Sequence, residues 1–142
     1  MYAKDIVNQY SVQVAKVYAQ LTADNNSANV VDLQGGQDVV AFVVFLHAVA
    51  AADGSNYFTV KVEESDDSGF ATGVTEVTAD ATRLIGTQPV VNAVALAGTL
   101  KKFGVTIGTK RYMRLVFDET GTADITVSAT AIVGGQRHLP VA

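Results

Sequence analysis

The fold is decided by two alternating stretches, Gly108-Thr109-Lys110-Arg111-Tyr112-Met113-Arg114-Leu115-Val116-Phe117 and, after a short polar turn, Asp124-Ile125-Thr126-Val127-Ser128-Ala129-Thr130-Ala131-Ile132-Val133. A period of two is typical of a strand with one buried face, and two such stretches joined by a short turn predict a β-hairpin. Met113, Leu115 and Phe117 share one face of the first stretch, and Tyr112 and Arg114 share the other. This second face is basic and aromatic, which suits contact with another protein better than catalysis.

Two further stretches predict long strands. Residues 39–51 are apolar on both faces, as expected for a central strand that is covered on two sides. After the turn at Asp53-Gly54, residues 57–64 alternate, with Phe58, Val60 and Val62 predicted to point inward. We expect these two strands to form a second hairpin.

The two ends of the chain are predicted to lie outside the sheets. Residues 1–26 contain an apolar stripe over 4–21 with spacings of three and four, which favours an amphipathic helix. The valines in the same segment also permit an extended arm lying on a neighbour. Residues 134–142 have no periodicity and are expected to form an extended C-terminal arm.

The spacing of the strands predicts the fold class. About seven to nine strands follow one another at intervals near 8–12 residues, without helical segments between them, which is typical of an all-β antiparallel sandwich. No repeat or linker divides the 142 residues, so we expect residues 1–142 to form a single domain.

Composition argues against several classes of partner. The net charge is -4, which is the opposite of what binding to a nucleic-acid backbone requires. The longest apolar run, residues 39–52, contains His47 and is too short for a bilayer-spanning helix, so no membrane partner is expected. We expect no signal peptide, because the start of the chain has no basic region followed by an apolar segment.

The sequence contains no recognisable catalytic, cofactor or metal site. Cysteine is absent and the two histidines, His47 and His138, lie far apart in the chain. Asp66-Asp67 lacks the spacing of a calcium loop, and no serine lies in a nucleophile motif. We therefore expect a protein that is not an enzyme and binds no cofactor.

Six of the ten Lys and Arg residues gather toward the C-terminal part: Lys101, Lys102, Lys110, Arg111, Arg114 and Arg137. One interpretation is a basic interface that docks on an acidic protein surface, for which we predict Lys110, Arg111, Tyr112, Arg114 and Arg137 as contact residues. The other is charge on edge strands that prevents aggregation. The sequence supports the two equally.

Several stretches together resemble a known family. They are Asn29-Val30-Val31-Asp32-Leu33, the apolar strand to Ala51, Tyr57-Phe58-Thr59-Val60-Lys61-Val62-Glu63-Glu64-Ser65-Asp66-Asp67, Gly108-Thr109-Lys110-Arg111-Tyr112-Met113-Arg114, Thr126-Val127-Ser128-Ala129 and the tail from Gly134 to Pro140. In this order they resemble the capsid cement, or decoration, proteins of tailed phages, which are encoded beside the major capsid gene.

The resemblance implies a jelly-roll-like sandwich that is made in the host cytoplasm and binds the outer surface of the phage head. Its partner would be an HK97-type major capsid protein, whose subunit contacts it would stabilise, and the protein would be a homodimer or homotrimer. A head–tail connector or tail protein shares this composition and stays as an alternative. A carbohydrate-binding sandwich is a second alternative, with Tyr57 and Tyr112 as its aromatic residues.

Overall fold

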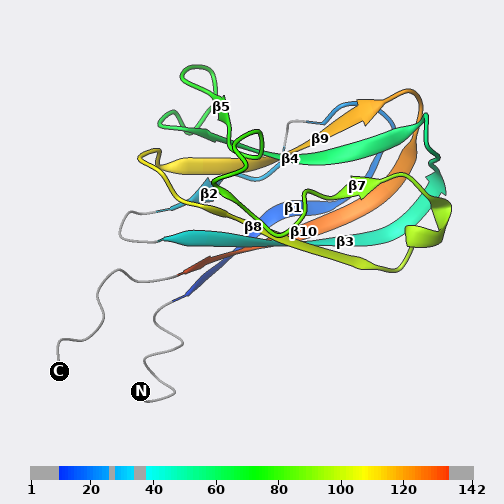
Figure 1. Ribbon diagram of the computed structural model, residues 1–142, viewed down its shortest axis with the longest axis horizontal. Helices are drawn as coiled ribbons and strands as arrows, with labels where there is room; N and C mark the ends of the chain where they lie inside the picture. The colour runs from blue at the N-terminus through cyan, green and yellow to red at the C-terminus, as the bar shows by residue number, and fades with distance from the viewer. Residues whose placement is uncertain (1–9, 26–27, 34–37, 135–142) are drawn as a thin grey trace, which may run out of the picture.

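The computed structural model describes residues 10–25, 28–33 and 38–134, which form two antiparallel sheets packed face to face (Figure 1). The strands are β1 (Ser11–Leu21), β2 (Val31–Asp32), β3 (Val39–Ala51), β4 (Tyr57–Ser65), β5 (Thr75–Glu76), β6 (Leu84–Ile85), β7 (Val90–Val91), β8 (Leu100–Thr106), β9 (Tyr112–Thr120) and β10 (Asp124–Gly134). A single 3₁₀ turn, η1 (Val94–Leu96), lies between β7 and β8.

The order of the strands is that of a jelly roll. Sheet A has the order β1-β10-β3-β8-β6, and sheet B has the order β2-β9-β4-β5, with β7 also paired to β4. From β3 onward the long strands β3, β4, β8, β9 and β10 alternate between the two sheets, and the first strand pairs with the last. The predicted all-β, jelly-roll-like antiparallel sandwich is therefore confirmed.

The core lies between the two sheets and follows the predicted alternation. Met113, Leu115 and Phe117 of β9 are fully buried, opposite the inward residues of β3 and β10 in the other sheet. Phe42 of β3 stacks on Phe103 of β8, with ring centroids 5.4 Å apart. Because every second residue points inward, one face of each sheet closes the core and the other faces away from it.

Both predicted hairpins are wrong, although their strands exist. β9 pairs with β4 in sheet B, whereas β10 pairs with β1 and β3 in sheet A. Likewise β3 belongs to sheet A and β4 to sheet B. The connections at 52–56 and 121–123 therefore cross from one sheet to the other. Each sheet supplies one wall of the same core.

The N-terminal helix is also wrong over the part of the segment that the structure describes. Residues 11–21 form β1, an edge strand of sheet A, which pairs along its length with β10. Val12 and Val14 both point away from the core. Because β-branched side chains favour the extended conformation, these residues are more stable in a paired strand than in a helix. Residues 11–21 are therefore neither a helix nor an arm on a neighbour.

Parts of both terminal predictions lie outside the described residues. Residues 1–9 belong to the predicted helix or arm, and 135–142 to the predicted C-terminal arm. Gly134, the first residue of that arm, is the last residue of β10.

Candidate interaction surfaces

The outer face of sheet B carries charges that are already paired. Lys61 of β4 forms an ion pair with Asp118 of β9, with Nζ and Oδ2 2.6 Å apart. This hydrogen bond raises the pKa of Lys61. Pairs of this kind are typical of a face that is exposed to solvent.

The predicted basic contact residues Lys110 and Arg111 lie where β9 begins, and both have acidic partners. Lys110 Nζ is 3.1 Å from Asp66 Oδ2. Arg111 donates through Nε and Nη2 to the two carboxylate oxygens of Asp32, at 3.1 and 3.0 Å. The hydrogen bond to Asp32 raises the pKa of Arg111, so the cation is held in place by its partner.

Arg114 is more deeply placed than Arg111. It donates through Nε and Nη2 to Glu63 Oε2, at 2.9 and 2.8 Å, and its guanidinium lies 4.4 Å from the ring centroid of Phe70. Tyr112 is half-buried, with the guanidinium of Arg111 5.1 Å from its ring centroid. The fifth predicted contact residue, Arg137, lies outside the described residues.

The structure thus gathers four of the predicted contact residues near the start of β9 but neutralises their charges locally. A partner at this surface would meet ion pairs, not free cations. The prediction that these residues form an interface stays a prediction, and the electrostatic argument for it is weaker than the sequence suggested.

The outer face of sheet A has the opposite character. Its outward side chains are mostly apolar or small and neutral, and we call them the neutral face: Val12, Val14 and Tyr18 of β1, Ser128, Thr130 and Ile132 of β10, Ala41, Val43, Phe45 and His47 of β3, Ile85 of β6, and Leu100 and Lys102 of β8. Lys102 is the only charged residue among these, and Asp124 at the start of β10 lies at one end of the same sheet, where it accepts a hydrogen bond from Gln20 of β1. Val12, Val14 and Tyr18 are 70%, 56% and 65% exposed.

An aromatic group lies near the middle of the neutral face. The His47 ring is 4.3 Å from that of Phe45 and 4.8 Å from that of Tyr18, centroid to centroid. His47 Nε2 is 2.8 Å from Ser128 Oγ, which is its one hydrogen-bond partner among the residues that the structure describes. The His47 ring is exposed.

The neutral face is large for a solvated surface. The four long strands β1, β10, β3 and β8, at about 4.8 Å spacing and with about seven residues each at about 3.4 Å, give an area of roughly 19 Å by 24 Å. Few monomeric proteins expose an apolar patch larger than a few hundred Å². This face therefore suits a protein–protein contact.

The sequence contained an indication of this surface. Residues 39–51 were expected to be covered on two sides because both of their faces are apolar. In the structure the core covers one side of β3, and the described residues of this chain leave Val43, Phe45 and His47 uncovered on the other. The expectation that both sides of β3 are covered is therefore wrong for the described residues, because its outer side is exposed or half-buried.

The described residues show no group of side chains that could hold a metal ion. Among them, no three His, Cys, Asp or Glu side chains are grouped as metal ligands. Asp67 accepts hydrogen bonds from the backbone N–H groups of Gly69 and Ala71, both at 2.9 Å, which lower its pKa. None of the helical segments in this part of the chain is long and apolar enough to cross a membrane.

Comparisons with known proteins give little. No protein family matches the chain, and neither does any curated protein. A solved structure described as "Structure of infectious bursal disease virus Gx strain" contains a similar chain, with 11% sequence identity and a TM-score of 0.42. The similarity covers 92% of this chain and 33% of that chain, so this protein spans about a third of its length. At that TM-score the similarity carries no functional argument.

Proposed function

We propose that this protein is a virion structural protein, a cement protein that binds the outer surface of a phage head and stabilises contacts between HK97-type major capsid subunits. The observation that carries the proposal is the neutral face, which is mostly apolar or neutral, exposed or half-buried, and spread over five strands. Support also comes from the resemblance of the sequence to capsid cement proteins.

The neutral face fits a mechanical role. A head filled with DNA fails when its subunits separate, and a protein that covers a junction adds buried apolar area to it. Lys102 is the one charged residue of the neutral face that would have to be desolvated, so burial of this face is favourable over most of its extent. The charged outer face of sheet B then remains toward solvent.

Repetition of the site over a shell fits a symmetric binder. We propose a homodimer or a homotrimer, because several weak contacts on one lattice act together. Sedimentation equilibrium of the purified protein separates these two states.

The test is co-sedimentation with empty shells of the major capsid protein of the same phage, before and after shell expansion. We expect saturable binding at a fixed ratio to capsid subunits. Val14→Glu places a charge on the neutral face and is expected to weaken binding at least tenfold. Val74→Glu is the matched control, because Val74 is also exposed but lies beside β5 at the edge of sheet B.

Each alternative result has a clear meaning. If neither form of the shell binds the protein, the cement function is wrong, and formation of isolated rings would then favour the connector alternative. Equal loss of binding in both valine variants would show that the neutral face is not the contact. Circular dichroism of each variant establishes that it is folded.

A further inference from the structure

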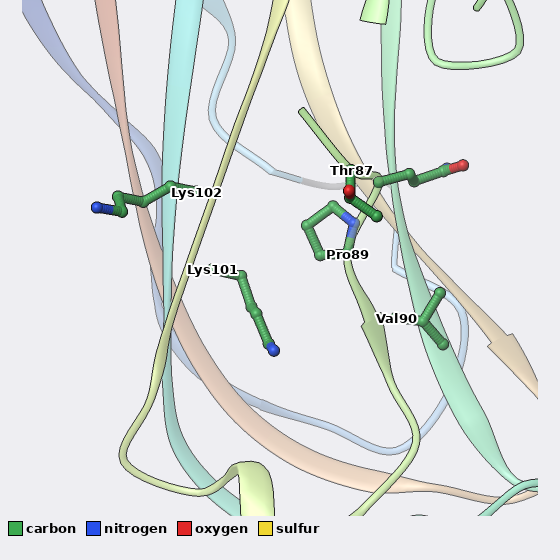
Figure 2. A pocket seen from close by; sticks show the side chains of 6 residues that line it. Thr87, Pro89, Val90, Lys101 and Lys102 are labelled. Atoms are coloured by element: carbon green, nitrogen blue, oxygen red, sulfur yellow. The ribbon is translucent and has the colours of Figure 1, made fainter. Parts of the chain in front are cut away.

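A second surface, at the border of the neutral face, has a chemistry of its own. A groove of about 370 Å³ lies between β8 and the segment that joins β6 to β7, and it is lined by Thr87, Gln88, Pro89, Val90, Lys101 and Lys102 (Figure 2). Lys101 extends between β8 and this segment, and Lys102 points the other way, over the neutral face.

The two lysines differ from the other cations of the described residues because neither has a carboxylate partner there. Within residues 10–25, 28–33 and 38–134, every other Lys or Arg pairs with Asp or Glu, except Lys16, which donates to the side chain of Asn25. Although the net charge of the protein is negative, Lys101 and Lys102 of β8 are two adjacent cations without a nearby carboxylate. A carboxylate of a ligand at this position would be attracted by both ammonium groups, and no existing ion pair would have to break.

The backbone of β8 is also open at this point. Thr106 N–H donates to Arg83 O, so the even-numbered residues of β8 direct their backbone groups away from β3. β6 pairs only with Gly104 and Val105. In the described part of the chain, no strand pairs with Leu100 and Lys102 on that side, which leaves a short free edge.

The path of the chain explains why the edge is open. At Gly86 the backbone has a φ of +83° and turns away from β8 toward sheet B. Val60 N–H then donates to Pro89 O at 3.0 Å, and Gln88 Nε2 donates to Val60 O at 3.1 Å. The far wall of the groove is therefore fixed to β4, and it does not close over β8.

We propose that this groove receives an extended acidic segment of the capsid protein, which adds as a strand to β8. Its backbone would pair with Leu100 and Lys102, and carboxylates on successive residues would face Lys101 in the groove and Lys102 above it. Strand addition supplies affinity through the backbone and specificity through alternate side chains. The identity of the partner rests on the proposed function, whereas the chemistry of the groove does not.

The test uses the isolated protein and the capped peptide acetyl-Thr-Val-Glu-Glu-Val-Thr-amide, followed by chemical shifts of the backbone amides. We expect saturable shifts at Leu100 to Phe103 and about fivefold weaker binding when the two glutamates are replaced by glutamine. Lys101→Gln and Lys102→Gln should each weaken binding of the glutamate peptide. Lys110→Gln is the matched control and should leave it unchanged, because Lys110 already pairs with Asp66 on the other sheet.

A peptide with N-methylated backbone amides separates strand addition from simple charge attraction. It keeps both carboxylates but cannot donate to β8, so we expect its binding to be lost. Equal binding of the methylated and unmodified peptides would overturn strand addition, and equal binding of the glutamate and glutamine peptides would overturn the role of the lysines. Absence of binding by any peptide, with shell binding intact, would reject the groove and leave the cement function standing.

Discussion

Arg83 and Glu64 join the two sheets through a two-pronged ion pair. Arg83 lies directly before β6 of sheet A, and its Nη1 and Nη2 are 2.7 and 2.8 Å from Oε1 and Oε2 of Glu64 in β4 of sheet B. The Glu64 side chain is only 7% exposed. Arg83 Nη2 also donates to Thr106 O at 2.9 Å, so one guanidinium connects β4 and β8.

This ion pair gives the first prediction. Arg83→Met leaves the Glu64 carboxylate buried without its cation, and we expect the free energy of unfolding to fall by about 3 kcal/mol. Urea unfolding at pH 7 measures the change. The double variant Arg83→Met with Glu64→Leu should recover most of the loss, because it removes the uncompensated charge; a double variant as unstable as the single one would show that packing, not charge, is what matters.

The second prediction concerns the connection between β9 and β10. Gly121 has a φ of +71°, and a Cβ there would lie 2.6 Å from Ser55 O and clash with the side chain of Asn56. Thr122 N–H donates to Asn56 Oδ1 at 2.8 Å, so the two crossing connections pack on each other. We expect Gly121→Ala to destabilise the protein by about 2 kcal/mol in thermal unfolding.

Gly54→Ala is the matched control for Gly121→Ala. Gly54 lies in the neighbouring connection and does not have a positive φ. A Cβ at this position would have no other atom within 4 Å. We expect it to change stability by less than about 1 kcal/mol. Similar losses in both variants would contradict the argument from contact between the connections.

These connections also mark the limit of what the sequence could predict. The alternation of Met113, Leu115 and Phe117 is local, so the buried face of β9 was predicted correctly. Whether the next strand folds back beside β9 or crosses to the other sheet depends on contacts such as Thr122 with Asn56, which are 66 residues apart. A polar turn permits both outcomes, and we therefore predicted hairpins where the chain crosses.

The candidate sites show the same limit. The cations of the predicted basic interface are local features, but their neutralisation is not, because Asp32 is 79 residues from Arg111 and Glu63 is 51 residues from Arg114. In β1, the spacing of Val14, Val17 and Tyr18 fits a helix, and only pairing with β10 selects a strand. The neutral face could have been predicted in part from the sequence, because residues 39–51 are apolar on both faces of β3.

The third prediction distinguishes the two arginines of β9. The Arg114 side chain is 16% exposed and lies against Phe70, whereas that of Arg111 is 58% exposed. We expect Arg114→Ala to cost about 1 to 2 kcal/mol of stability and Arg111→Ala less than about 1 kcal/mol. Chemical unfolding of both variants measures the difference.

The predicted role of these residues in docking is tested by one double variant and one single variant. We expect Arg111→Glu with Arg114→Glu to weaken binding to shells if they form an interface, but part of that loss would come from the fold, because a glutamate at 114 faces Glu63. Arg111→Ala alone tests docking with little effect on stability. Shell occupancy unchanged in Arg111→Ala would remove Arg111 from the interface.

The last prediction concerns Lys16, an inward-pointing cation on the edge strand β1. Lys16 is 7% exposed, and its Nζ donates to Asn25 Oδ1 at 3.0 Å. Burial lowers the pKa of Lys16. An inward charge on an edge strand discourages pairing with another chain, at a cost in stability.

The sign of the pH effect follows from the lowered pKa. Between the folded pKa and the unfolded value near 10.5, the unfolded state binds more protons, so this residue makes the folded state more stable as the pH rises. We expect Lys16→Met to raise the free energy of unfolding by about 1 kcal/mol at pH 7, with the difference from wild type shrinking as the pH approaches about 10.

Lys61→Met is the opposite control, measured in the same urea titrations at pH 7 and pH 10. The hydrogen bond to Asp118 raises the pKa of Lys61, so its contribution is present below the unfolded value and is lost as the pH rises through the folded one. We expect Lys61→Met to lower stability at pH 7 by less than about 1 kcal/mol, since the pair is partly exposed. A Lys16→Met protein less stable than wild type at pH 7 would show that the bond to Asn25 outweighs the cost of burying the charge.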